Sequence, residues 1–528
     1  MPDSHIKATP WLCPVLIAAV LLLLVACSEN NGPLNTDQTD DQPERISDLR
    51  LDSTVHGSIY LSWTAVEIDT EPGGPDPAYD VRWAADSTAL IEWTNAAIAA
   101  SPPDPAPAGS HEQLVVHGLY PDTVYFFGVK IYGDPAGPSP LSNIVSSPSF
   151  DDFIVLFPDT CLEAAVREHA NVPEGDIYYS ALLGLSSFQA EARDITSLSG
   201  LEYLRNLEHL HLQHNHIRFL WPLQHMTNLR FLYLWSNVIT DIDPLSGLTG
   251  LQSLHLDINR ISDIAALSGL TGLRQLDLSD NPISDLGPLS GLINLESLTL
   301  GDEGSIDDIT PLASLGSLQH LSVKSDRLHD LGPLSGLTSL RRLILTGPEM
   351  NDLGPLSTLS NLEMLSLNGN GIIDIEPLYG LTNLQVLDLG NNEIGNIDSL
   401  SGMTDLQALH LENNFITNTD VLAIMTGLSY LHLGGNRLSS IDVLAPLTGL
   451  QYVYLNGNEI SNIDALANLV ELDYLDLQDN QITRIYPLVK NNGLGSGDQV
   501  YLYGNPLGDM AIRKILPLLR SRGVSVYF

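Results

Sequence analysis

Leucines recur every 22 residues through the second part of the chain, from Leu185 onward. In the unit 273–292, Leu276 and Leu278 alternate with polar neighbours. This alternation predicts a short strand with its leucines in a core and its polar residues on the opposite, concave face. Later apolar positions, up to Leu292, would close the core from an outer, partly helical arc. The units begin at Leu185, Leu207, Leu229, Leu251, Leu273, Leu295, Leu318, Leu340, Leu362, Leu384, Leu406, Leu428, Leu450 and Leu472.

An asparagine follows the strand in most units, as at Asn281. One short side chain with both a donor and an acceptor can satisfy backbone groups of neighbouring coils, so we expect it to be buried at the turn. Three consecutive units have Glu303, Asp326 and Pro348 at this position, and one of them has 23 residues instead of 22. We therefore expect an irregular structure in the middle of the array.

An aspartate recurs just before the outer arc, and we interpret it as a local cap or turn former. A calcium ladder is the alternative, but these acids lack the dense ligand spacing of calcium loops. The aspartates are Asp241, Asp263, Asp285 and Asp374.

The period and the motif resemble the 22-residue repeats of internalins and related bacterial surface proteins. The resemblance implies a leucine-rich-repeat solenoid, an α/β horseshoe, over 185–506. A solenoid needs capped ends, which we place at 151–184 and 507–528.

Each cap has a helical pattern. Thr160 and Glu163 are spaced as a capping box, which predicts an amphipathic helix that begins there and runs to about Ala170. At the other end Gly523 would end a second helix, and 524–528 could add a last edge strand. The apolar face of that helix would consist of Ile512, Ile515, Leu516 and Leu519.

The first 27 residues predict an export signal. An apolar run from Trp11 to Ala26 leads directly to Cys27, and 24–28 resemble the bacterial lipobox, which implies that Cys27 is lipidated. An uncleaved anchor is the alternative, but 16 apolar residues are short for a membrane span. The polar stretch 28–44 predicts a disordered tether.

Residues 45–148 alternate with period two in short segments between Gly- and Pro-rich loops, which predicts an all-β sandwich of about seven strands. Trp63 and the segment 119–125 resemble the core tryptophan and the Leu-x-Pro-x-Thr-x-Tyr signature of fibronectin type III domains. The resemblance implies that Tyr125 is the corner tyrosine and that the domain serves as a spacer. A second binding surface is the alternative.

The composition and the motifs of the chain argue against several classes of function. The 528 residues carry a formal charge of −41, with 64 acidic and 23 basic residues, which argues against a nucleic-acid partner. No nucleophile elbow, phosphate loop or His-Glu-x-x-His motif is present, so we expect no enzyme, no cofactor and no metal. A zinc site built from His209, His211 and His255 is the alternative.

Large side chains gather on the concave face when the strand positions are aligned in columns. Grouped exposed aromatic residues often form binding sites, although such residues also suit strands for structural reasons. One patch near the start of the array contains His209, His211, Phe231, Tyr233, Trp235 and His255, and one near its end contains Tyr430, His432, Tyr452, Tyr454, Tyr474 and Tyr501.

These features together predict an exported, membrane-anchored bacterial lipoprotein of the cell envelope or cell surface. It would be a monomer that binds a protein or a glycan, without catalysis, through the concave face. The alternatives are a scaffold that binds a partner of the same cell, and an accessory module of a secreted hydrolase system.

The lipid anchor makes a direct prediction. A Cys27→Ala variant should be released from the membrane or remain unprocessed, because the acceptor thiol is gone. Cell fractionation with immunoblotting measures this, and a mature-length variant that still fractionates with the membrane would show that the lipobox interpretation is wrong.

Overall fold

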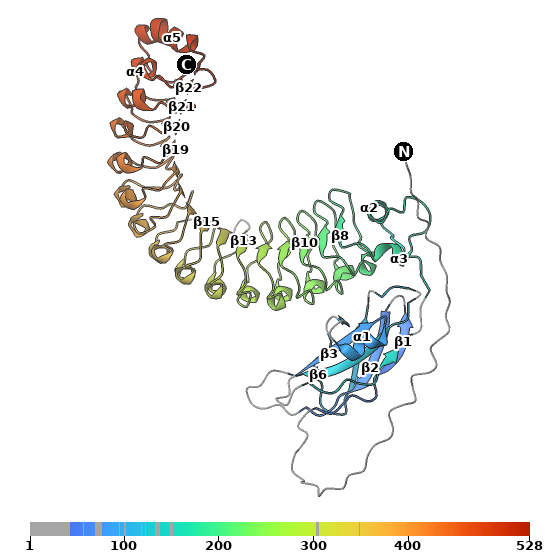
Figure 1. Ribbon diagram of the computed structural model, residues 1–528. Coiled ribbons are helices and arrows are strands. Elements are labelled where there is room, and N and C mark those ends of the chain that lie inside the picture. Colours follow the sequence, from blue (N-terminus) through green and yellow to red (C-terminus); the bar gives the residue numbers. More distant parts are fainter. Residues whose placement is uncertain are drawn as a thin grey trace, which may run out of the picture.

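The computed structural model describes residues 43–528 except 56–57, 69–76, 94–95, 100–101, 118, 122, 133–137, 148–150, 302–305 and 348. The predicted signal, Cys27 and nearly all of the tether lie outside the described residues. Two small antiparallel sheets lie beside the beginning of a long, curved solenoid (Figure 1).

The two small sheets enclose one core. Apolar residues from the strands of both sheets are buried in it, among them Trp63, Val81 and Phe127. One sheet has the order β1-β2-β5 and the other β4-β3-β6-β7. The elements are β1 (Arg50–Val55), β2 (Ser58–Thr64), β3 (Ala78–Ala84), α1 (Ser87–Glu92), β4 (Ala97–Ile98), β5 (His111–Val116), β6 (Phe126–Tyr132) and β7 (Val145–Ser146).

The two aromatic residues noted in the sequence hold fixed places in this region. Trp63 is fully buried and meets Tyr79 edge to face, with ring centroids 5.1 Å apart. The hydroxyl of Tyr125 accepts a hydrogen bond of 3.1 Å from the backbone N–H of Tyr120. Tyr125 lies directly before β6, and its own N–H donates to the hydroxyl of Ser147.

The repeats form one parallel sheet, ordered from β23 to β8 without a crossover. Equivalent residues of successive coils are direct partners, as Leu276 and Leu298 show. The strands are β8 (Ser187–Gln189), β9 (His209–His211), β10 (Phe231–Tyr233), β11 (Ser253–His255), β12 (Gln275–Asp277), β13 (Ser297–Gly301), β14 (His320–Lys324), β15 (Arg342–Thr346), β16 (Met364–Ser366), β17 (Val386–Asp388), β18 (Ala408–His410), β19 (Tyr430–His432), β20 (Tyr452–Tyr454), β21 (Tyr474–Asp476), β22 (Gln499–Tyr501) and β23 (Ser525–Tyr527).

The outer arc consists of short 3-10 helices. An aspartate ahead of most of them forms an Asx turn, in which Oδ1 of Asp285, for example, accepts the N–H of Gly287 at 2.8 Å. The turn-former interpretation of these acids is therefore confirmed. The helices are η1 (Leu201–Tyr203), η2 (Trp221–Leu223), η3 (Asp243–Leu245), η4 (Ala265–Gly269), η5 (Gly287–Leu289), η6 (Thr310–Ser314), η7 (Gly332–Gly336), η8 (Gly354–Thr358), η9 (Glu376–Leu378), η10 (Asp398–Gly402), η11 (Asp420–Ile424), η12 (Asp442–Leu444) and η13 (Asp464–Asn468).

The buried asparagines form a ladder through the solenoid, as predicted. Nδ2 of Asn259 donates to the carbonyls of Leu234 in the preceding coil and Leu256 in its own, at 3.0 and 2.9 Å. Its Oδ1 accepts the N–H of Ile239. Each of these carbonyls also accepts from the asparagine of a neighbouring coil, whereas the N–H of Ile239 is bonded by Asn259 alone.

The irregular middle is confirmed, in a form that the sequence did not suggest. Strands β13, β14 and β15 have five residues each, whereas the flanking strands have three. Additional strand pairing, such as Leu300 with Val323, replaces hydrogen bonds of the missing asparagines. The hydroxyl of the fully buried Ser325 donates to the carbonyl of Ile306. Glu303 and Pro348 lie outside the described residues.

The amino-terminal cap corrects one prediction. Helix α2 (Thr160–Ala170) has the predicted extent, but its N-cap is Asp159, not Thr160. Oδ1 of Asp159 accepts the N–H groups of Cys161 and Leu162, while Oδ2 accepts those of Thr196 and Ser197 in the first coil. One carboxylate therefore caps the N-terminus of the helix and also attaches the helix to the solenoid. A second helix, α3 (Tyr179–Leu182), completes this cap.

Gly200 allows the cap to approach the first coil closely. Its φ of 103° lies in the region that favours glycine, and a β-carbon there would collide with the ring of Phe157. Cys161 is a free thiol that is partly buried against the core.

The carboxy-terminal cap has the predicted edge strand, β23, paired with β22. Its helices are α4 (Tyr486–Lys490), the π-helical turn η14 (Ala511–Ile515) and α5 (Leu516–Ser521). Because the π turn changes the angular spacing of side chains, Ile512 is 41% exposed, whereas Ile515, Leu516 and Leu519 are buried as predicted.

The asparagine ladder can be tested by substitution. Asn259→Ala should lower the free energy of unfolding by about 1–3 kcal/mol, because the buried N–H of Ile239 is left without a partner. Urea denaturation measures the loss. The matched control is Asn294→Ala, because the exposed Asn294 makes only one bond to a backbone carbonyl. Equal losses in the two variants would contradict a special role for the buried amide.

Candidate functional site

The strands present two aromatic patches on the concave face. The N-terminal patch, defined as the six residues from His209 to His255 named above, has its rings stacked across neighbouring strands. His209 lies on Phe231 at 4.5 Å and His211 on Tyr233 at 4.5 Å. Parallel in-register pairing causes this, because it places equivalent positions of successive coils side by side. Trp235 meets His214 edge to face, at 4.0 Å.

The structure does not bring His209, His211 and His255 together as zinc ligands. The ring of Tyr233 stacks against His211 on one side and against His255 on the other, at 4.5 and 4.9 Å. The side chain between the two histidines therefore keeps their nitrogens apart. Among the described residues, these three do not form a metal-binding group.

The second patch is continuous, but it is not the straight row of Tyr430, Tyr452 and Tyr474 that the column pattern suggests. Each of six successive strands contributes one ring. The rings alternate between two columns up to Tyr501, which shares its column with Tyr527. We call this set the aromatic ladder: His410, Tyr430, Tyr454, Tyr474, Tyr501 and Tyr527, with successive centroids 4.5, 5.5, 4.8, 5.2 and 4.6 Å apart.

Two members of the predicted patch lie beside the ladder. Tyr452 is 41% exposed and stacks on Tyr430 at 6.3 Å, and His432 meets Tyr454 edge to face at 4.8 Å. The sequence analysis missed Tyr527 as a site residue, because it lies on the cap strand outside the repeat period. Its predicted edge pairing with β22 was the available signal.

Two phenol groups of the ladder, those of Tyr430 and Tyr474, are neutral at physiological pH. Burial raises the pKa of Tyr430 to about 12, and the nearby hydroxyl of Tyr454 and carboxylate of Glu412 contribute. Burial likewise raises the pKa of Tyr474 to about 12. The rings therefore offer apolar area together with hydroxyl groups that can donate or accept hydrogen bonds.

Glu412 lies beside the ladder, two residues after His410. Its Oε2 atom is 2.8 Å from Nδ1 of His432, which makes an ion pair when the imidazole is protonated. This oxygen is buried, and the imidazole of His432 is its close polar neighbour.

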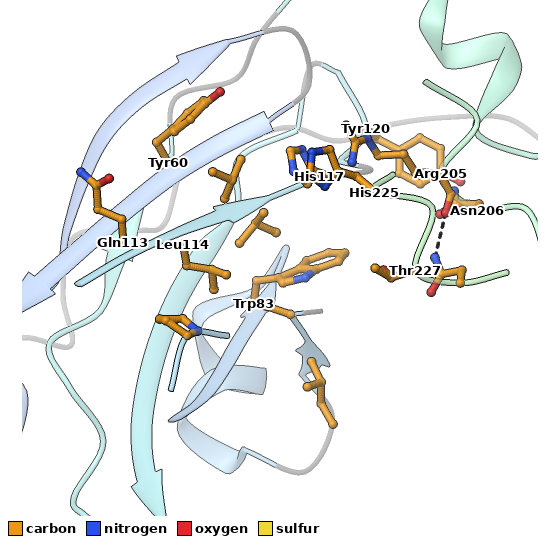
Figure 2. A pocket seen from close by; sticks show the side chains of 16 residues that line it. Tyr60, Trp83, Gln113, Leu114, His117, Tyr120, Arg205, Asn206, His225 and Thr227 are labelled. Carbon is orange, nitrogen blue, oxygen red and sulfur yellow. Dashed lines mark hydrogen bonds between the residues drawn. The ribbon is translucent and has the colours of Figure 1, made fainter. Parts of the chain in front are cut away.

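A cavity of about 620 Å³ separates the small sheets from the first coils (Figure 2). Tyr60, Trp83 and His117 line it from the sheets, and Arg205 and His225 from the solenoid. Figure 1 shows that the small sheets lie on the side of the array away from its strands, so they leave the concave face open.

The imidazoles of His117 and His225 and the guanidinium of Arg205 all line this cavity. The rings of His117 and His225 stack with centroids 6.0 Å apart. Burial lowers the pKa of His117 to about 4, and the charges of Arg205 and His225 lower it further. Burial, followed by Arg205, also lowers the pKa of His225. Burial lowers the pKa of Arg205, and the negative charge of Glu202 opposes this effect.

The repeats match known families. Models described as leucine-rich repeats in two copies match residues 227–269, 271–314, 360–402 and 382–424, and further leucine-rich-repeat models match 425–482 and 203–218. The fold and these matches define a leucine-rich-repeat protein.

Solved structures identify the family more closely. An internalin (InlF) of Listeria monocytogenes is 30% identical, with a TM-score of 0.55 over 67% of this chain and 96% of that one. The chain therefore belongs to the internalin-like leucine-rich-repeat proteins. The functional domain of InlJ from the same species is 24% identical, with a TM-score of 0.54 over 65% of this chain and 80% of that one.

A leucine-rich-repeat protein of Leptospira interrogans is 20% identical, with a TM-score of 0.52 over 66% of this chain and 91% of that one. At this identity the likeness shows the fold alone, as it does for InlJ. A comparison with curated protein sequences gives no match. Within the described residues, no helix has the length and apolar character needed to cross a membrane.

The cavity predicts a pH-dependent contact between the small sheets and the solenoid. In the unfolded chain His117 is exposed to water and has a pKa near 6.5. In the folded protein its pKa is about 4, so it stays neutral down to about pH 4. The unfolded chain therefore binds more protons below pH 6.5, so stability should fall as the pH drops from 6.5 towards 4. Urea denaturation across this range measures the effect. His117→Gln/His225→Gln should weaken the dependence, and an unchanged profile would contradict the assignment. The exposed His111 provides a control variant, His111→Gln.

Proposed function

We propose that this chain is a non-catalytic, surface-anchored binding or adhesion protein whose ligand lies on the concave face, against the aromatic ladder. The observation that carries the proposal is the continuous row of rings over six neighbouring strands. A packed core would account for buried leucines, but not for a row of partly exposed tyrosines on the opposite face of the strands.

The chemistry of the ladder suits a protein or a glycan ligand. Tyrosine combines a large contact area with a polar hydroxyl and loses little conformational entropy on binding. The outer arc instead repeats Pro-Leu-Ser-Gly-Leu-Thr, which offers few distinctive contacts. A net charge of −41 disfavours a nucleic-acid ligand.

The amino-terminal part would carry the binding face away from the membrane. In this proposal the lipid on Cys27 anchors the chain, the segment 28–44 is a tether, and a fibronectin type III-like domain over 45–148 is a spacer. The two sheets with a shared core, the buried Trp63 and the bonded Tyr125 hydroxyl support the assignment of the domain.

A scaffold that binds a partner within the same cell envelope is the second candidate, since an acylated anchor serves both roles. Protease treatment of intact cells distinguishes them, because only an adhesion protein requires outward display. Cleavage of the repeats on intact cells supports adhesion, and protection until the cells are lysed supports the scaffold.

The binding surface predicts a loss of affinity on substitution. The triple variant Tyr430→Ala, Tyr452→Ala and Tyr474→Ala should abolish binding while folding is retained, because these side chains lie outside the leucine core. A pull-down with the purified chain identifies the partner, and calorimetry then compares the affinities.

The matched control changes two tyrosines of the outer side. Tyr379 and Tyr486 are 60% and 54% exposed, so Tyr379→Ala/Tyr486→Ala removes similar side chains without touching the concave face. Full affinity in the triple variant would rule out the ladder as the site. Equal losses in both variants would also contradict it.

A further inference from the structure

Three potential metal ligands converge at the amino-terminal end of the aromatic ladder. His410 ends β18, Glu412 follows it by two residues, and His432 is the direct strand partner of His410 on β19. One ligand atom from each lies within 4.8 Å of the other two. Neighbouring strands and the alternation along β18 together produce this arrangement.

We propose that His410, Glu412 and His432 bind a divalent transition-metal ion, for which zinc is the best match. Two imidazole nitrogens and one carboxylate oxygen form a donor set that suits zinc and leaves a fourth position open. Bonds of about 2.0–2.2 Å place tetrahedral ligands about 3.3 Å apart, so small side-chain rotations would complete the site.

The surroundings hold these ligands in place. The ring of His410 stacks on Tyr430 at 4.5 Å, and His432 meets Tyr454 edge to face at 4.8 Å. Packing of this kind restricts the imidazole rotamers and so lowers the cost of assembling a site. Oε2 of Glu412 is buried and lies 2.8 Å from Nδ1 of His432, a contact that a cation bound by both groups would replace.

Glycines flank Glu412 in its column of the sheet. The equivalent residues of the coils before and after it are Gly390 and Gly434. A β-carbon at Gly390 would collide with Oε1 of Glu412, so the carboxylate can take its present position only beside a glycine. The φ of Gly390 lies outside the left-handed region, so alanine there would act through this collision and not through backbone strain.

A second group occupies the same three relative positions at the other end of the array. His255, Asp257 and Asp277 also place ligand atoms within 4.8 Å of one another. This group has only one imidazole, and Oδ1 of Asp277 already accepts hydrogen bonds from the N–H and the hydroxyl of Ser279. It therefore provides an internal comparison with a poorer donor set for zinc.

An oxygen of a ligand bound on the concave face beside the ladder would complete the coordination of the first site. This role rests on the proposed function, whereas zinc binding itself does not. The two can fail separately, since metal binding is measured on the chain alone.

The test is calorimetric titration of the metal-free full chain with zinc chloride. We expect Glu412→Gln and His432→Ala each to weaken one zinc site by at least as much as the roughly 10–100-fold losses caused by changes around metal ligands. Gly390→Ala should also weaken it, although it changes no ligand. Thermal unfolding followed by circular dichroism confirms that each variant is folded.

Two control variants complete the design. His320→Ala removes an exposed histidine of the same sheet, and Asp277→Asn disrupts the second group; both should keep the site. Cobalt(II) gives an independent readout, because tetrahedral coordination intensifies its visible absorption and loss of a ligand removes this signal. The proposal is overturned if the wild-type chain binds no zinc. It is also overturned if Glu412→Gln binds as tightly as wild type, or if only Asp277→Asn loses the site.

Discussion

One buried amide in each of most coils underlies the rest of this structure. Each turn after a strand leaves backbone groups without partners in a core of leucine side chains, where no water can replace them. Asparagine supplies a donor to two carbonyls and an acceptor for one N–H, as Asn259 does. Because the bonds reach into the adjacent coil, they also fix the register that places equivalent strand positions side by side.

This register determines which residues of the repeats lie next to one another on the surface. Residues 22 apart become neighbours, so a chain with a tyrosine or histidine at two strand positions acquires a row of touching rings. The same geometry brings His410, Glu412 and His432 together, although Glu412 and His432 are 20 residues apart in sequence. The strands that carry these side chains are held by the leucine core behind them.

The repeat period accounts for what the sequence could predict. It placed Leu276 and Leu278 in the core and Asn281 at the turn, because these depend on local alternation and on a rigid period. Contacts outside the period were missed. Asp159 caps α2 instead of Thr160 because its second oxygen also bonds residues of the first coil, 37 and 38 positions away.

The candidate sites show the same limit. The columns identified which tyrosines share a face, but not that Tyr430 would contact Tyr454, because side-chain rotamers decide between straight and diagonal pairing. Glu412 does not belong to an aromatic column, and Gly390, which makes room for it, is informative only beside its carboxylate. The fit of the small sheets against Arg205 and His225 depends on surface shape, which no periodic pattern encodes.

The regular spacing of the rings in the aromatic ladder has a consequence for the kind of ligand that fits it. It extends over six strands, a length of about 24 Å at the usual strand spacing, and offers nearly equivalent steps about 4.8 Å apart. A polymer with its own regular repeat could be held in several registers and shift between them without complete release. Recognition on such a surface would select for the length and periodicity of a ligand more than for any single group on it.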